Sequence, residues 1–204
     1  MPENSKQKIL STATKLFAKK GFDAVSIREI CKKANVNICM ISYYFGGKKE
    51  LYQAIIDELI ERQTEYAKTF LNLDEDLTTI PKKQQIQILM LVLDKFIEFF
   101  YNNITTDVLI FLLKEQHNPK AKIESPAFKY LRRLIACIFD KKENDREIIF
   151  KTLFIISQIN SPRLLPLFSL KPLGQDNFTQ KDIKIIKENL KLYVNVLLKE
   201  AKVD

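Results

Sequence analysis

The stretch from Ser26 to Leu51 reads SIREICKKANVNICMISYYFGGKKEL, and it predicts two short helices joined by a turn. Ser26 and Glu29 have the spacing of a capping box, in which the serine hydroxyl accepts the amide hydrogen three residues on and the glutamate reaches back. We expect the helix that follows Ser26 to end near Ala34. The next helix should cover residues 37–44, and two glycines then stop it.

A longer amphipathic helix is predicted upstream, from Ser5 to Lys20. Its apolar stripe consists of Ile9, Ala13, Leu16 and Phe17, at the spacing of one helical face. Two short helices joined by a short turn and packed on a longer helix form the helix-turn-helix arrangement. In that arrangement the second short helix enters the major groove of DNA. The sequence therefore predicts a DNA-binding module at the start of the chain.

The second short helix carries no charged side chain. We expect its core side to consist of Ile38, Ile41 and Phe45. A groove-binding helix needs apolar contacts to thymine methyl groups as well as polar contacts, so a methionine and two tyrosines suit its exposed side. The residues expected on that side are Asn37, Cys39, Met40, Ser42, Tyr43 and Tyr44. Two interpretations of Cys39 stay open, a redox-active thiol near DNA and, as the favoured one, a small side chain at the interface.

Positive charge is concentrated in the same part of the chain. The formal net charge is +8, from 33 basic and 25 acidic residues. The first 50 residues hold ten basic and four acidic groups, which gives +6, and the other 154 residues contribute only +2. This asymmetry favours an N-terminal module that faces a polyanion, although lysines on solvated helix faces give the same balance.

Another long helix is predicted to begin at Lys48 and to run to about Leu71. A lysine in the first turn is unfavourable for a helix, because the amide hydrogens and the macrodipole there favour an anion. Lys48 becomes useful at this position if a DNA phosphate docks there. Arg28 and Lys49 complete the basic residues that we expect at the DNA.

These motifs resemble the DNA-binding domain of the TetR/AcrR family of transcriptional regulators. The strings that carry the resemblance are SIREI (26–30), ANV (34–36) and ISYYFGGKKELY (41–52). The match covers about residues 6 to 55 without gaps. It implies that Ser26, the second short helix with its two tyrosines, and Lys48 meet DNA. Tyr44 stands where the family often has histidine and Ser42 where many members have tyrosine, so a base preference cannot be carried over.

The rest of the chain is predicted to be helical as well. Four Gly and seven Pro are few for 204 residues, whereas all-β folds need many turns. The segment 82–101 is apolar nearly all round, so we expect a central, buried helix there. Pro162, Pro166 and Pro172 should allow only a short helix at 163–168. The other predicted helices are 107–116, 125–139, 145–160 and 179–199. We therefore predict an all-α protein.

The C-terminal part resembles the ligand-binding and dimerisation domain of the same family. The segments LKEQHNP at 113–119 and SPAF at 125–128 are similar to those of the CecR-like branch. We accordingly expect a helix-turn-helix domain at residues 1–47 and a connecting helix at 48–71. An effector-binding and dimerisation domain should occupy residues 72–204.

The predicted buried helix at 82–101 supplies aromatic side chains for a binding pocket. At helical spacing such residues belong first to the core, and pocket lining is the alternative. The aromatic candidates are Phe96, Phe99, Phe100, Tyr101, Phe111 and Phe139. Glu115 and His117 are candidates for the polar end of a ligand, although a lone histidine near a helix end is more often a cap or exposed. An effector held here would gain mainly from apolar burial, so we expect a largely apolar or amphipathic organic molecule.

The family resemblance also implies that the last two long helices pair with their mates across a two-fold axis. Both helices carry more apolar width than one core face requires, and an isolated monomer would leave that surface in water. We therefore expect a homodimer built on a four-helix bundle. The residues expected at its interface are Ile149, Ile156, Leu190, Val194 and Leu197.

The composition argues against several other classes of protein. His117 is the only histidine, and no GxGxxG, P-loop, GxSxG or EF-hand pattern is present, so we expect neither an enzyme nor a cofactor. Three cysteines without CxxC or Cys/His pairing argue against disulfides and metal sites and favour reduced thiols in a cytoplasmic protein. No signal peptide is visible, and the longest apolar run, 88–93, is far too short to span a membrane.

Together these features predict a homodimeric transcriptional regulator, a repressor whose N-terminal module binds a double-stranded DNA operator. A small molecule in the C-terminal core would release the operator by favouring a conformer whose recognition helices miss successive major grooves. The alternative is an effector-independent DNA-binding or architectural protein that acts through protein partners. A cavity of roughly a few hundred Å3 would favour the sensor, and a fully packed core would favour the alternative.

Overall fold

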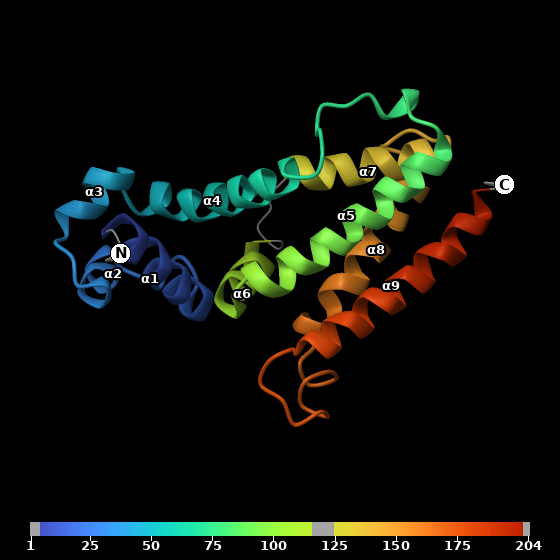
Figure 1. Cartoon of the computed structure of the whole chain (residues 1–204). Helices are drawn as coiled ribbons and strands as arrows, with labels where there is room; N and C mark the ends of the chain where they lie inside the picture. Colours follow the sequence, from blue (N-terminus) through green and yellow to red (C-terminus); the bar gives the residue numbers. More distant parts are fainter. Residues whose placement is uncertain (1–4, 116–124, 202–204) are drawn as a thin grey trace. The chain divides into compact units, whose positions relative to one another are not determined.

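The computed structural model describes residues 5–115 and 125–201, and within these ranges every regular element is a helix (Figure 1). The predicted all-α class is confirmed. The contacts divide the chain into two compact units, each with a hydrophobic core of its own. One unit comprises the N-terminal helices as far as Gln63 together with α6 (Thr106–Glu115), and the other comprises the remaining helices.

The N-terminal unit begins with α1 (Ser5–Lys20), α2 (Ile27–Ala34) and α3 (Cys39–Phe45). The Ser26 half of the predicted capping box is present, because its hydroxyl accepts the amide hydrogen of Glu29 at 3.1 Å, whereas the Glu29 side chain turns to lysines. The Glu29 carboxylate lies 2.7 Å from the ammonium group of Lys20, so it stabilises the packing of α2 on α1.

Two residues in left-handed backbone conformations shape the turns around α3. Asn35 ends α2 with a φ of 53°, and its amide donates to the carbonyl of Cys31. Gly46 ends α3 with a φ of 95°, which a residue without Cβ adopts at little cost. The chain can therefore turn sharply on both sides of α3 and enter α4 (Lys48–Lys68) directly.

The core of the N-terminal unit includes one helix that the sequence assigned elsewhere. Phe111 of α6 is 2% exposed and belongs to the same apolar cluster as Ile9, Phe17 and Ile41. The centroid of its ring lies 4.8 Å from the centroid of the Tyr52 ring. The expected domain at 72–204 therefore does not coincide with a compact unit, because the apolar face of α6 is buried in the N-terminal core.

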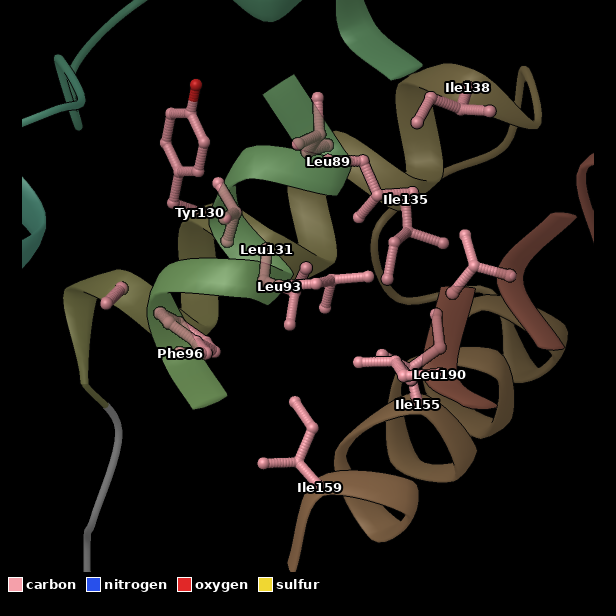
Figure 2. Close-up of a cluster of buried hydrophobic side chains, with 14 of the residues drawn as sticks. Leu89, Leu93, Phe96, Tyr130, Leu131, Ile135, Ile138, Ile155, Ile159 and Leu190 are labelled. Carbon is pink, nitrogen blue, oxygen red and sulfur yellow. The ribbon is translucent and has the colours of Figure 1, made fainter. Parts of the chain in front are cut away.

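The C-terminal unit is a layered bundle. Its elements are the 3-10 turn η1 (Leu77–Thr79), α5 (Lys82–Asn103), α7 (Pro126–Ile138), α8 (Arg146–Leu164) and α9 (Gln180–Glu200). Leu93, Leu131 and Ile155 come from three different helices and meet in its core (Figure 2). The predicted caps are present at Ser125 and Thr179, and Thr179 and Asp182 form a reciprocal capping box.

The boundary at the end of α8 differs from the prediction. The helix runs through Pro162 to Leu164, and no separate helix forms at 163–168. A proline removes one backbone hydrogen bond and crowds the carbonyl four residues earlier, and α8 ends two residues after it. The amide of Leu165 still donates to the carbonyl of Ser161 at 2.9 Å, which closes that turn.

Within the described ranges no single helix is both long and apolar enough to cross a membrane. By length and composition alone, the pair formed by α5 and α6 meets that criterion, with a bend between the two helices.

Candidate nucleic-acid interface

The core side of α3 fixes which of its residues face outward. Ile41 is fully buried, and Met40, Tyr44 and Phe45 are partly buried against the N-terminal core. Cys39, Ser42 and Tyr43 remain exposed, and Tyr43 is the most prominent with 78% of its surface accessible.

Ile38 departs from the prediction that placed it in the core. It stands at the N-cap position of α3 and is 46% exposed. The preceding Asn37 uses its side-chain oxygen to accept the amide hydrogen of Cys39 at 2.9 Å. Because Asn37 caps the helix and Ile41 fills the core one turn later, Ile38 is left at the rim of the exposed face.

The basic residues expected at the DNA lie on the helices before and after α3. Arg28 and Lys49 are exposed, as is Ser26 at the start of α2. The ammonium group of Lys48 lies 4.3 Å from the ring centroid of Phe22 and 3.5 Å from the carbonyl oxygen of Asp23. Among the residues that the structure describes, Lys48 forms no ion pair with a carboxylate. Its charge is therefore held in place by a ring and a carbonyl and stays available for an external anion.

The thiols of this unit differ in environment. Cys31 is buried in the core, and desolvation raises the pKa of its thiol. Cys39 is exposed on α3. The exposed position is compatible with both interpretations of Cys39, a redox-active thiol and a small side chain at the interface.

The residues expected to line a ligand pocket belong to two different units. Phe96, Phe99, Phe100 and Tyr101 lie on α5, whereas Phe111 lies in the N-terminal unit. Each aromatic ring of α5 packs against a ring of its own unit: Phe96 against Phe128, Phe99 against Tyr66, and Phe100 against Tyr101, which also meets Phe178. These rings are therefore engaged with one another and with neighbouring rings.

The remaining pocket candidates are also separated. Phe139 lies beneath the ammonium group of Lys151, 4.7 Å from the ring centroid. Glu115 is buried in the N-terminal unit and accepts a hydrogen bond from the hydroxyl of Tyr52. Burial and this neighbouring carboxylate raise the pKa of the Tyr52 hydroxyl. His117 lies outside the described residues.

A hollow of about 230 Å3 lies between α5 and α9 in the C-terminal unit. Its floor is apolar, formed by Leu93, Ile97 and Leu190 together with Met90. Its rim is charged, and Lys187 bridges the carboxylates of Asp94 at 2.8 Å and Glu98 at 3.0 Å. None of the aromatic residues predicted for the pocket lines this hollow. The periodicity of α5 identified its core face but not the groove beside it.

The predicted dimer contacts need a correction as well. Leu190 and Val194 are 2% and 1% exposed, so they fill the core of their own protomer. Ile156 and Leu197 are partly buried against the same core. Of the predicted set, Ile149 is exposed at 46%. The other large apolar side chains exposed on α8 and α9 are Phe150, Leu153, Phe154, Ile185, Leu192 and Val196.

Comparison with known proteins identifies similar chains. Residues 9–55 match the family model described as "Bacterial regulatory proteins, tetR family". The chain is 29% identical over its full length to the "Probable HTH-type transcriptional regulator YttP" of Bacillus subtilis strain 168, of which the match covers 98%. It is 27% identical to the HTH-type transcriptional dual regulator CecR of Shigella flexneri, over 96% of this chain and 92% of CecR. The similarity to CecR expected for the C-terminal part is thus found across nearly the whole chain.

The fold is shared with solved regulators. A transcriptional regulator of the "TerR/AcrR family" from Aquifex aeolicus VF5 gives a TM-score of 0.57 at 18% identity, over 95% of this chain and 99% of that one. Crystalline AmtR from Mycobacterium smegmatis gives a TM-score of 0.62 at 15% identity, over 100% of this chain and 88% of that one. At these identities the likeness establishes the architecture, and the curated relatives are regulators of transcription, not enzymes.

Proposed function

The chain belongs to the TetR family of bacterial regulatory proteins and is a DNA-binding transcriptional regulator, and on this premise we propose that it is a homodimeric repressor released by a small amphipathic effector. The observation that carries the proposal is the exposed face of α3. It presents Cys39, Ser42 and Tyr43, and the neighbouring helices α2 and α4 of the same unit carry Arg28, Lys48 and Lys49. An uncharged helix face in a unit that carries cations suits a major groove bordered by phosphates.

Repression requires only that the face of α3 and the basic residues of the same unit hold the protein on its operator. A protein seated on an operator that overlaps a promoter excludes the polymerase without any further contact. The test is a reporter gene placed behind an operator selected from random duplexes. Removal of the regulator should raise reporter expression; a fall in expression would show activation instead.

The proposed dimer follows from the exposed apolar side chains of α8 and α9. On α8, Ile149 with Leu153 and Phe150 with Phe154 lie one turn apart, so they form neighbouring rows. On α9, Leu192 and Val196 have the same spacing and are 64% and 61% exposed. Because α8 and α9 pack against each other, a second copy related by a two-fold axis can cover both helices at once. Such a dimer would place two α3 helices for successive major grooves.

The proposed effector site is the hollow between α5 and α9. Leu93, Ile97 and Leu190 provide apolar burial for the body of a ligand, and the Lys187 ion pairs provide a polar end. Small-molecule sites usually have volumes of ~300 Å3 or more, so the ligand should be small or extend beyond the rim. The donor groups present do not form a metal site or a phosphate-binding turn, so an amphipathic organic molecule fits best.

The effector test is a release screen. Apolar drugs, bile-salt-like amphiphiles, metal ions and nucleotides are each added to the protein–operator complex. Met90→Trp should fill the hollow and abolish release by the active compound, with DNA affinity unchanged within about two-fold. Leu91→Trp is the matched control, since Leu91 is an exposed neighbour on α5 that does not line the hollow. Release by a metal ion or nucleotide alone would contradict the proposed site.

The second candidate function is effector-independent DNA binding. The packing of the α5 aromatic rings favours it, because Phe96, Phe99 and Tyr101 are each engaged with a ring of their own unit. An active compound in the screen whose effect Met90→Trp removes would decide for the sensor.

A further inference from the structure

The position of Ile38 gives it a role that the helical period did not predict. Its φ of −59° and ψ of −31° are helical, so its side chain continues the register of α3. Ser42 lies one turn further on, and Cys39 and Tyr43 form a second pair with the same spacing. With 46% of its surface exposed, Ile38 therefore belongs to the face that α3 presents outward.

The chemistry of this face is unusual for base recognition. Residues 37–45 contain no Arg, Lys, Asp or Glu. Arginine and lysine are the side chains that most often contact guanine, and an asparagine typically pairs with adenine through its oxygen and its amide together. The side-chain oxygen of Asn37 already accepts the amide hydrogen of Cys39 at 2.9 Å. The face consequently lacks the usual guanine contacts, and its one carboxamide is engaged in the helix cap.

An exposed branched alkyl group has one apolar counterpart in the major groove, the C5 methyl group of thymine. Contact between the two removes both from water, which is favourable in proportion to the area buried. The cations beside the face, Arg28, Lys48 and Lys49, can supply affinity through phosphates, but phosphate contacts carry no base sequence. Any sequence discrimination by α3 itself must therefore come from uncharged groups.

We infer that Ile38 is a specificity-determining residue that contacts a thymine methyl group, and that each operator half-site contains a thymine whose methyl group is required. This inference rests on the proposed placement of α3 in the major groove. An isolated exposed isoleucine would carry little weight, because single apolar side chains are common on protein surfaces. Ile38 differs because it precedes the exposed thiol of Cys39 and lies one turn before the exposed hydroxyl of Ser42, on the second helix of a helix-turn-helix motif.

The experiment removes the methyl group from the DNA. Duplexes are selected from a random pool with the full-length protein, and each thymine of the selected site is replaced in turn by deoxyuridine, which pairs identically but lacks the methyl group. At one thymine in each half-site we expect the replacement to weaken binding about four-fold, and about fifteen-fold when both are replaced. Fluorescence anisotropy measures each dissociation constant.

The protein variants complete a thermodynamic cycle. Ile38→Ala should weaken binding to the thymine duplex by a similar factor and should bind the thymine and uracil duplexes equally at that position. Ile110→Ala is the matched control, since Ile110 is an exposed isoleucine on α6 of the same unit, 39% exposed. It should keep the full preference for thymine. Ile38→Val, which loses one methylene group, should keep most of the preference for thymine over uracil.

The possible failures separate this inference from the proposed function. If no duplex is enriched, the placement of α3 in the major groove is wrong and the inference falls with it. If a duplex is bound but thymine and uracil are equivalent at every position, the regulator stands and the methyl contact does not. The same holds if Ile38→Ala retains the wild-type ratio, because another residue then contacts the methyl group.

Discussion

The outward face of α3 and the outward face of α8 and α9 both expose large apolar side chains, but their surroundings differ. Tyr43 on α3 is 78% exposed and Leu192 on α9 is 64% exposed. On α3 the apolar groups share the face with a hydroxyl and a thiol, and the neighbouring helices of the same unit carry exposed cations. On α8 they form adjacent rows, Ile149 with Leu153 and Phe150 with Phe154. Exposure of apolar surface therefore does not identify the partner; the neighbouring groups do, and they point to DNA at α3 and to a second copy at α8 and α9.

The charges of the two units show the same contrast. Lys48 beside α3 contacts the Phe22 ring and a carbonyl. In the C-terminal unit Lys187 is paired with Asp94 and Glu98, and Lys151 with Glu147 and Glu200. A lysine that its own chain neutralises gains little from a phosphate. We therefore expect the salt dependence of DNA binding to come from the N-terminal unit.

The largest effect should come from charging the apolar face of α9. Leu192→Glu places a carboxylate where the proposed dimer buries a leucine, and desolvation of that charge opposes association. We expect a folded monomer and a loss of operator affinity of about a hundred-fold or more, because the two half-sites no longer act together. Sedimentation velocity and anisotropy measure the two quantities.

The matched control is two residues away on the same helix. Leu190 is 2% exposed, so Leu190→Glu should destabilise the protomer itself and lower the thermal unfolding midpoint. Leu192→Glu should lower the midpoint much less, because Leu192 is not part of the core of its own protomer. If the wild-type protein sediments as a monomer at micromolar concentration, the outward face of α8 and α9 is not a dimer interface, and its contrast with the DNA-binding face of α3 is lost.

A smaller effect is expected at Lys48. Lys48→Ala should weaken binding to all duplexes alike, by about ten-fold at low salt, because a phosphate contact is independent of sequence. The slope of log affinity against log salt should fall by about one for each half-site. Binding measured at several salt concentrations gives the slope.

Lys191→Ala provides the comparison on the C-terminal unit. Lys191 is an exposed lysine on α9, and its removal should leave the salt slope unchanged. Equal slopes for the two variants would argue against the phosphate contact at Lys48. A changed base preference for Lys48→Ala would contradict it directly.

Much of the fold could be predicted because local signals determine helix ends. The predicted and observed limits of the first helix agree at Ser5 and Lys20, and caps were found at Ser26, Ser125 and Thr179. These signals depend on side chains within one turn of the cap. Pro162 was misjudged, because α8 includes this proline and ends only two residues later, at Leu164.

The faces of the helices were harder to predict. Leu190 and Leu192 are both apolar residues of α9, yet one is buried and the other is 64% exposed. A helix with apolar residues on several sides does not reveal which side its own core takes. Phe111 was placed in the wrong unit for a related reason, since periodicity indicates that a residue is buried without identifying the core that buries it. Tertiary contacts decide both questions.

The smallest expected effect tests the ion pairs of the C-terminal unit. Glu98 accepts hydrogen bonds from Lys95 at 2.8 Å and Lys187 at 3.0 Å, and these contacts lower the pKa of its carboxyl group from 4.5 to about 2. A folded-state pKa below the unfolded value gives stability that is present above about pH 4.5 and is lost as the pH falls toward 2.

Glu98→Gln should therefore lower the thermal unfolding midpoint at pH 7, and the difference from wild type should shrink as the pH falls from about 5 to about 2. The difference at pH 7 should be only a few degrees, roughly one to three, because the side chain is about a third exposed and solvent screens it. Glu188→Gln is the control, since its pair with Lys184 lies on the solvated side of α9 at 4.0 Å. A midpoint difference for Glu98→Gln that stays constant from pH 7 to pH 2 would mean that these lysines are not neutralised by Glu98. The contrast in charge between Lys48 and the paired lysines of the C-terminal unit would then be weaker.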